Sequence, residues 1–258
     1  MTIDLNSDMG EGWGVYRLGD DAAMLGVVTS ANIACGFHAG DPLVMAATIA
    51  GAAAHGVGIG AHPSFLDPWG FGRRPMVGEN PDDIEKLLIY QIGALAALAQ
   101  AAGQTLSHVK THGSLNNLAN EDDGLATAVA RAVKTVDRDL ILVVMPGLAS
   151  ERAGERLGLR LAREVFADRA YTAAGTLVSR KRAGAVIHDA EAAAARVLRM
   201  VERQAVETED GGTVPARIDT VCVHGDTPGA VAMATLVRAR LEGAGVALAP
   251  LRDVLAGR

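Results

Sequence analysis

Side chains that can move protons or bind anions recur just after short apolar runs in this chain of 258 residues. Runs of this kind, rich in Val and Ile, are typical of parallel strands that are covered on both faces. The carboxyl ends of such strands meet at one face of a barrel, where their loops form the active site. We therefore expect one shared site that includes Asn6, Asp8, Glu11, His38, Asp41, His62, Lys110, His112, Glu164, Asp168, His224 and Asp226.

Lys110 is the most informative of these residues, because it lies in an apolar run that should be buried. Burying an ammonium group without a partner is costly, so we expect a carboxylate beside it. In that setting Lys110 would bind an anion or act as an acid. The loop DMGEGWG supplies two carboxylates, Asp8 and Glu11, for which an ordinary turn is the alternative role.

Some of the other residues also have a structural alternative. Asp41 and Asp226 each precede a helix start that contains proline, where an aspartate commonly caps the helix. His38 and His62 could be core histidines whose ring nitrogens bond backbone carbonyls. These alternatives and a role in the site remain open at the level of the sequence.

A second group of candidates is basic. Two glycines in the segment 70–74 free the backbone to approach a ligand, and Arg73 and Arg74 supply planar cations suited to phosphate or carboxylate. Arg180 belongs to a second basic position, next to Lys181. The sequence contains no P-loop, no dinucleotide-binding glycine fingerprint and no GxSxG elbow.

A metal site is a further hypothesis. Metal binding requires three or four nitrogen or oxygen donors that converge on one point. Asp8, His38 and His62 follow consecutive strands and could form a set of two histidines and one carboxylate. No HExxH or HxH spacing supports that set.

The elements that must position these residues alternate between strand and helix almost from end to end. Seven strands are predicted, at Ile3–Asn6, Ser30–Cys35, Val57–Ala61, His108–Lys110, Leu140–Met145, Arg160–Phe166 and Thr220–His224. Strands that alternate with helices indicate parallel βαβ units. Seven strands in this length favour a closed or nearly closed barrel, with an open doubly wound sheet as the alternative.

Helix starts are marked by capping residues. The sequence from Asn80 to Gly103 has an N-cap, a proline at the first helical position and a glycine stop. Other helices are expected to start near 122, 147, 189 and 226. The run 246–248 could be an eighth strand or a surface ribbon, and 206–218 resembles a hairpin insertion. With no break in composition, residues 1–258 are expected to form a single domain.

Composition excludes several classes of function. The net charge of −6 and the lack of a basic stripe argue against nucleic-acid binding, as does an aromatic content of 3%. No uninterrupted apolar stretch reaches the length of a membrane span, and the polar start of the chain does not fit a secretory leader. Cys35 and Cys222 are expected to be buried thiols, and the protein is expected to be cytoplasmic.

Eight segments together resemble the LamB/YcsF family, which is associated with the A subunit of bacterial 5-oxoprolinase. In chain order they are DLNSDMGEG (4–12), NIACGFHAGDP (32–42), GAHPSF (60–65), GFGRR (70–74), HVKTHGSL (108–115), REVFADRAY (163–171), LVSR (177–180) and CVHGDTP (222–228). The chain departs from the family pattern HVKPHGALYN at Thr111, Ser114 and Asn116. If the replaced tyrosine contacts substrate or a partner, Asn116 changes specificity.

The resemblance implies an α/β fold, a distorted TIM-like barrel of the (β/α)7 type related to glycoside hydrolases and deacetylases. It also implies ATP-dependent opening of 5-oxo-L-proline to L-glutamate, with Mg²⁺ and with subunits B and C as partners. On that basis Lys110, Arg73 and Arg74 would stabilise anions. Asp8 or Glu11 would hold Mg²⁺ or accept the lactam proton, and histidines such as His38, His62 and His112 would move protons.

Two other functions remain open. The same Asp and His set, with the related fold, would suit a metal-dependent amide hydrolase or deacetylase. The lack of a nucleotide motif would suit a lactam-binding subunit without catalytic activity. A homo-oligomer is an open expectation, since no coiled-coil heptad specifies one.

Overall fold

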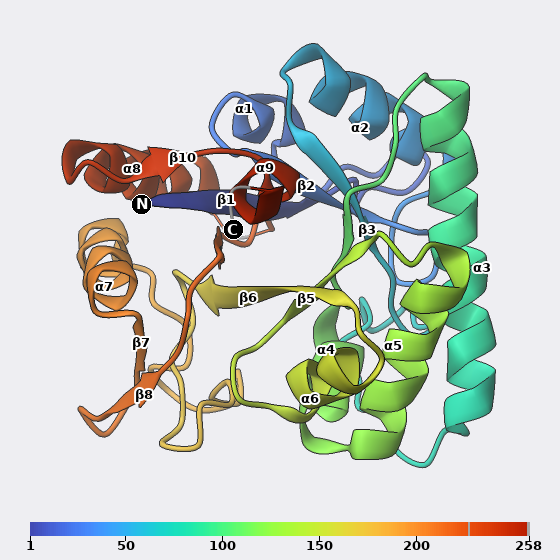
Figure 1. The fold of residues 1–258 in the computed structure, drawn as a ribbon. Helices are drawn as coiled ribbons and strands as arrows, with labels where there is room; N and C mark the ends of the chain where they lie inside the picture. Colours follow the sequence, from blue (N-terminus) through green and yellow to red (C-terminus); the bar gives the residue numbers. More distant parts are fainter. Residues whose placement is uncertain (227, 257–258) are drawn as a thin grey trace.

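The computed structural model describes residues 1–226 and 228–256 and contains a closed barrel of parallel strands (Figure 1). The barrel strands are β1 (Thr2–Met9), β2 (Ser30–Ala34), β3 (Gly58–His62), β4 (His108–Val109), β5 (Ile141–Val144), β6 (Arg160–Phe166) and β9 (Thr220–Cys222). Each pairs with the next in that order, and β9 also pairs with β1, which closes the cylinder. The predicted seven-stranded barrel is confirmed, and the open sheet is excluded.

Three short strands lie outside this cylinder. The run expected to form an eighth strand contains β10 (Ala247–Leu248), which pairs in parallel with Thr2 and Ile3 at the start of β1. β7 (Ala205–Glu207) and β8 (Thr213–Pro215) pair antiparallel, so the structure has a hairpin where the sequence suggests an insertion.

Helices cover the outside of the barrel (Figure 1). They are α1 (Asp21–Leu25), α2 (Pro42–Ala54), α3 (Pro81–Ala101), α4 (Gly113–Glu121), α5 (Asp123–Val136), α6 (Ala149–Arg156), α7 (Ala190–Arg203), α8 (Ala230–Gly243) and α9 (Leu251–Ala256). Asn80, Asp122 and Asp189 cap α3, α5 and α7 through their side chains, at the predicted starts.

One predicted helix start is wrong. The last barrel strand is followed not by a helix at Asp226 but by a turn, and α8 begins at Ala230 after Gly229 in the left-handed region. The carboxylate of Asp226 pairs instead with Arg73, 2.8 Å away. Thr227, which belonged to the predicted start, lies outside the described residues. An aspartate before a proline indicates a cap only where no cation competes for its carboxylate.

Helix α3 alone among the described helices has the length and mean hydropathy, 1.2 over its most apolar window, of a membrane span. It packs against α2 and α5, and its buried face includes Ile84, Leu88, Ile92 and Leu95. The spacing of three or four residues between these positions is typical of one face of an amphipathic outer helix.

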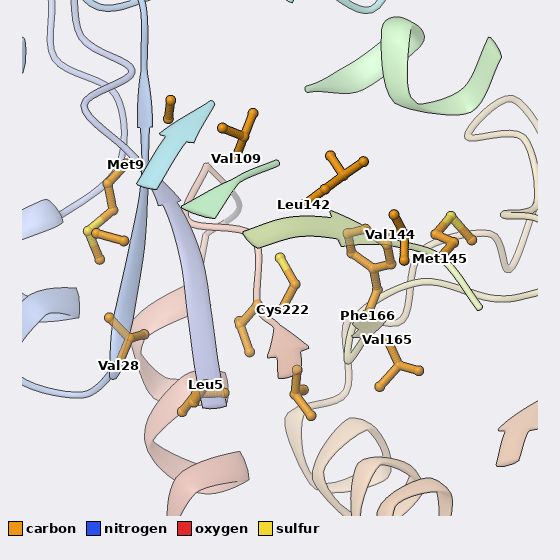
Figure 2. Packing of buried hydrophobic residues seen from close by; sticks show 14 of the residues in the cluster. Leu5, Met9, Val28, Val109, Leu142, Val144, Met145, Val165, Phe166 and Cys222 are labelled. Carbon is orange, nitrogen blue, oxygen red and sulfur yellow. The ribbon is translucent and has the colours of Figure 1, made fainter. Parts of the chain in front are cut away.

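The inside of the barrel is polar, although the strands are buried. Side chains alternate between the faces of a strand, so Asp4, Asn6 and Asp8 share one side of β1. Ile3 and Leu5 lie on the other side and belong to the main hydrophobic core, where Figure 2 shows Leu5 among buried residues of neighbouring strands. The expectation of buried thiols is confirmed, since Cys35 and Cys222 are both free and buried.

Asp4 lies in the lower layer of this polar interior, where it accepts hydrogen bonds from the hydroxyl groups of Thr29, Ser30 and Thr220. Burial raises its pKa from 3.8 to about 6, and these hydrogen bonds offset only part of the shift. The folded protein therefore binds a proton at Asp4 more tightly than the unfolded chain does. Its contribution to stability is present at low pH and is lost as the pH rises through about 6.

We expect Asp4→Asn to remove this pH dependence. Between pH 4.5 and 7.5 the free energy of unfolding of the wild type should fall by about 2 kcal/mol relative to the variant. Urea denaturation of both proteins at the two pH values measures this difference. A constant difference across this range would contradict the assignment to Asp4.

Candidate active site

The carboxyl ends of the barrel strands surround a pocket of about 570 Å³. Seven of the residues selected from the sequence line it: Asp8, His62, Arg73, Lys110, His112, Arg180 and His224. They come from four strand ends and two loops, and they are separated by up to 216 positions in the chain. The closed barrel thus brings together most of the groups expected to do chemistry.

Lys110 lies at the floor of the pocket between two carboxylates. Its Nζ is 2.9 Å from Oδ1 of Asp8 and 3.0 Å from Oε1 of Glu164, and it donates to the sulfur of Cys222 at 3.0 Å. Burial alone would lower the pKa of Lys110, but Asp8, Cys222 and Glu164 raise it well above its usual value. The ammonium is therefore charged at neutral pH. The carboxylate that the sequence predicts beside Lys110 is present.

Asp8 is held as an anion by its surroundings. Burial opposes its ionisation, but the imidazole of His62 and the ammonium of Lys110 hold its pKa well below the usual value. Its Oδ1 accepts from Lys110 and from Asn32, while Oδ2 lies 3.3 Å from Nε2 of His62. Asp8 is thus the ionised carboxylate at the pocket surface.

A layer of amides and a histidine supports this ion pair from below. Asn6 donates to Oε1 of Glu164 at 3.0 Å and accepts from Asn32 at 2.7 Å. His108 contacts Oδ1 of Asn32 at 2.9 Å, and burial followed by the charge of Lys110 lowers the pKa of His108 to about 3. Asn6 and Glu164, predicted as site residues, therefore hold Lys110 and Asp8 in place from outside the pocket lining.

His224 and Asp168 form a second pair at the pocket. Nδ1 of His224 lies 2.8 Å and 2.9 Å from the two carboxylate oxygens of Asp168, and the ring stacks on Phe166. Burial opposes ionisation of Asp168, yet His224 keeps its pKa below the usual value. A carboxylate on Nδ1 fixes the tautomer and leaves Nε2 free to take a proton.

Three histidines and Glu11 form a third group, beside Asp8. His38 and His112 stack with ring centroids 3.8 Å apart, and His112 Nδ1 is 2.9 Å from Nε2 of His62. Oε1 of Glu11 lies 3.4 Å from His38 Nε2 and 3.6 Å from His112 Nδ1. The metal hypothesis from the sequence named Asp8 with His38 and His62, whereas the donors that converge here are those of Glu11 and the three histidines.

Arginines form the rim of the pocket. Arg73 lines the pocket, and Asp226, which is outside the lining, pairs with it. Arg180 makes no hydrogen bond or ion pair with the residues that the structure describes, and burial followed by the charge of Arg73 lowers its pKa. An exposed guanidinium at the edge of a pocket is a ready site for an anion.

Residues 3–256 match the description "LamB/YcsF family". The chain belongs to the LamB/YcsF family. It is 56% identical over 249 residues to a protein from Rhodopseudomonas palustris (strain BisB18) that is named as the A subunit of 5-oxoprolinase, covering 96% of this chain and 98% of that one.

Solved structures agree with this assignment. A lactam utilization protein from Thermus thermophilus superposes with a TM-score of 0.91 at 46% identity, covering 96% of this chain and 99% of that one. The catalytic domain of a peptidoglycan N-acetylglucosamine deacetylase from Eubacterium rectale reaches a TM-score of 0.53 at 13% identity, with coverage of 98% and 89%. The second likeness shows the fold alone.

Two of the predicted site residues of this LamB/YcsF protein belong neither to the pocket lining nor to the polar groups that contact it. Asp41 caps α2 by accepting from the backbone of Leu43 and Val44, as its structural alternative predicts. The guanidinium of Arg74 binds the carboxylate of Asp67, and its side chain is 62% exposed. The sequence could not separate Arg74 from Arg73, because only the loop conformation decides which of them faces the pocket.

The segment that departs from the family pattern borders the pocket. Thr111, Ser114 and Asn116 all line it, and Thr111 donates to the side-chain oxygen of Asn116 at 3.2 Å. Asn116 therefore lies in the pocket wall. That it changes the substrate specificity stays a prediction.

Three residues of the site were missed or given no role from the sequence. Asn32 and His108 lie within apolar runs, where a polar residue can equally be a satisfied core group. Asp168 follows a strand end, but nothing in the sequence shows that His224 is its partner. The alternation of inward-facing positions along β2 could have indicated Asn32.

Proposed function

We propose that this chain is the A subunit of an ATP-dependent 5-oxoprolinase, which opens 5-oxo-L-proline to L-glutamate together with subunits B and C. The name of its relative at 56% identity over nearly the whole chain supports the substrate. The observation that carries the proposal is the content of the pocket. The buried ammonium of Lys110 and the carboxylate of Asp8 lie there together with His224, which pairs with Asp168. Arg180 also lines this pocket.

The substrate is a small lactam with one carboxylate, and the polar groups of the pocket match both parts. We place the substrate carboxylate on Arg180, a guanidinium at the pocket that makes no hydrogen bond or ion pair among the described residues. The lactam ring then points toward the floor, where Lys110 and Asp8 lie. Phe166, beneath His224, provides an apolar wall for the ring carbons.

Lactam hydrolysis needs help because amide resonance protects the carbonyl carbon and ring closure competes with opening. ATP would supply this help by phosphorylating the lactam oxygen, which makes the carbon electrophilic. Water would then add to that carbon, the C–N bond would break, and the ring nitrogen would take up a proton, which leaves an acyl phosphate. A second water would hydrolyse the acyl phosphate and release phosphate. The overall products are glutamate, ADP and phosphate.

The residues of the pocket fit the proton transfers that these reaction steps require. Nε2 of His224 would take a proton from the attacking water, with Asp168 stabilising the resulting imidazolium. Lys110 would stabilise negative charge on the lactam oxygen and keep Asp8 ionised. Asp8 would accept or return a proton at the ring nitrogen.

The requirement for ATP and Mg²⁺ belongs to this proposal. Mg²⁺ takes oxygen ligands, and Asp8 is a carboxylate at the pocket floor whose pKa lies well below its usual value. Arg73 and Arg180 supply positive charge suited to phosphate at the entrance. A cytoplasmic location and a homo-oligomer stay predictions.

Reconstitution tests the proposal directly. The chain should be mixed with separately purified B and C subunits of a 5-oxoprolinase, and glutamate and ADP should be measured with and without 5-oxoproline. We expect both products only when all three chains, ATP and 5-oxoproline are present. Product formation at the same rate without this chain would overturn the proposal.

Replacing Arg180 should separate binding from chemistry. In the reconstituted enzyme, Arg180→Gln is expected to raise KM for 5-oxoproline about 10- to 100-fold with a smaller change in kcat, because a charged hydrogen bond contributes to binding throughout the reaction. Arg182→Gln is the matched control, since Arg182 is exposed and pairs with Glu209. An unchanged KM in Arg180→Gln would place the substrate carboxylate elsewhere.

A further inference from the structure

We propose that Glu11, His38, His62 and His112 form a binding site for one divalent transition-metal ion, with Zn²⁺ as the best match. Four donor atoms, one from each side chain, lie within 4.8 Å of one another, and all four residues are buried. This proposal rests on the geometry of the cluster alone. It stands whether or not the chain acts on 5-oxoproline.

The spacing of the donors fits a single ion. Ligand atoms about 2.0–2.1 Å from a tetrahedral zinc ion lie roughly 3.3 Å from one another. Oε1 of Glu11 is 3.4 Å from His38 Nε2 and 3.6 Å from His112 Nδ1, and the nearest two nitrogens, of His62 and His112, are 2.9 Å apart. The remaining donor–donor distances are at most 4.8 Å, so shortening them by up to about 1.5 Å places all four around one centre.

The backbone fixes which nitrogen of two rings points into the cluster. Nδ1 of His62 lies 2.8 Å from the carbonyl oxygen of Lys110, so this nitrogen carries the proton and Nε2 carries the lone pair. Nε2 of His112 lies 2.8 Å from the carbonyl oxygen of Phe71, so Nδ1 carries the lone pair. Carbonyl groups of this kind are typical supports of metal-bound imidazoles.

These tautomers leave two lone pairs facing each other. With both outer protons held by carbonyl groups and both rings neutral, His62 Nε2 and His112 Nδ1 are two acceptors 2.9 Å apart, which only an added proton or a bound cation can bridge. Two such nitrogens repel each other unless a cation lies between or beside them. A metal ion that binds both lone pairs removes this repulsion.

One oxygen of Glu11 and both ring nitrogens of His38 have no hydrogen-bond partner among the described residues. Within the described residues, Oε1 of Glu11 and Nε2 of His38 are buried atoms with no hydrogen-bond partner, and their side chains are 5% and 0% exposed. A buried carboxylate without a partner is costly, and buried polar groups are almost always satisfied. Both residues belong to the same group of four donors as His62 and His112, and Oε1 of Glu11 lies 3.6 Å from Nδ1 of His112.

The donor set selects the class of metal. Three imidazoles and one carboxylate suit Zn²⁺ and its first-row neighbours, whereas Mg²⁺ and Ca²⁺ prefer oxygen ligands throughout. Asp8 is adjacent, with Oδ2 3.3 Å from His62 Nε2, but its Oδ1 is used by Lys110. Because His62 and His112 also line the pocket, the ion would lie in the pocket wall.

Close packing around the cluster keeps the four side chains in place. Gly72 has a φ of +63°, and a Cβ at this position would lie 2.8 Å from Cδ2 of His112 and 2.9 Å from Cβ of His38. The stacked rings of these two histidines thus depend on the absence of a side chain at Gly72. A cluster enclosed in this way cannot relieve its unpaired atoms by turning them to solvent.

Metal binding to the purified full-length chain tests the proposal. The protein should carry no histidine tag, should be stripped with chelator, and should then be titrated with Zn²⁺ and, separately, with Co²⁺. We expect about one equivalent of either ion per chain, a higher Tm, and the visible absorption of four-coordinate Co²⁺. Mg²⁺ alone should give none of these changes.

Variants locate the ion. Glu11→Gln and His38→Gln should each weaken Zn²⁺ binding at least about tenfold and abolish the cobalt absorption, with unchanged circular dichroism in the absence of metal. His188→Gln is the matched control, because His188 is exposed and lies far along the chain from the cluster. If Glu11→Gln fails to fold, His38→Gln, which removes no charge, gives the same comparison.

Two outcomes would overturn the proposal. One is a stripped wild-type chain that takes up less than about 0.1 equivalent of Zn²⁺ or Co²⁺ in excess metal. The other is one equivalent that binds with unchanged affinity to both variants, which would place the ion elsewhere. Activity of the reconstituted enzyme enters neither criterion, so failure here and failure of the proposed function are distinguishable.

Discussion

Replacing Lys110 by methionine is expected to lower turnover of 5-oxoproline by at least about 10²- to 10³-fold in the reconstituted enzyme. Lys110 is the buried cation between Asp8 and Glu164, and its loss removes the positive charge at the pocket floor. The same change leaves two buried carboxylates without their partner, at a cost of about 3–5 kcal/mol in stability. Steady-state kinetics and urea denaturation measure the two effects.

A second variant separates the loss of chemistry from the loss of stability. The double substitution Lys110→Met and Glu164→Gln removes the charges of both partners, so it should recover part of the stability but none of the activity. Lys86→Met is the matched control, because Lys86 is exposed on α3. Turnover close to that of the wild type in the folded double variant would remove Lys110 from the mechanism.

The second large effect is expected at His224. His224→Gln should lower kcat about 10²- to 10⁴-fold, because glutamine cannot take a proton from water. Asp168→Asn should also lower kcat, since it removes the acceptor that fixes the tautomer of His224. In Asp168→Asn, the pH profile of kcat should change as well, which a purely structural defect would not cause.

His188→Gln again serves as the control for the histidine substitution. Melting temperatures of His224→Gln and Asp168→Asn should be compared with that of the wild type before kinetics are interpreted. If His224→Gln retains more than about half of wild-type kcat, another group activates the water. His62 and His112, which line the same pocket, would then be the next residues to replace.

Much of the fold could be predicted because its signals are local. A short apolar run specifies a buried strand, and the caps Asn80, Asp122 and Asp189 specify helix starts within the same few residues. The order of strands around the barrel follows from right-handed connections between neighbouring parallel strands. The start of α8 was missed because the partner that draws Asp226 away, Arg73, is 153 residues distant.

The sequence could predict which residues belong to the candidate site, but not which of their side chains contact one another. Strand-end position is enough to place Asp8, Lys110 and His224 in one pocket. It does not show that Glu164 shares Lys110 with Asp8, or that Glu11 faces His38. Those pairings depend on the register between strands and on side-chain rotamers, which the sequence of a single chain does not specify.

The structure of the assembled enzyme with 5-oxoproline bound tests the central claim most directly. The ligand should lie in the pocket at the barrel mouth, with its carboxylate on Arg180 and its ring amide within hydrogen-bond reach of Lys110 or Asp8. A ligand bound in another subunit, or on another face of this chain, would contradict the account.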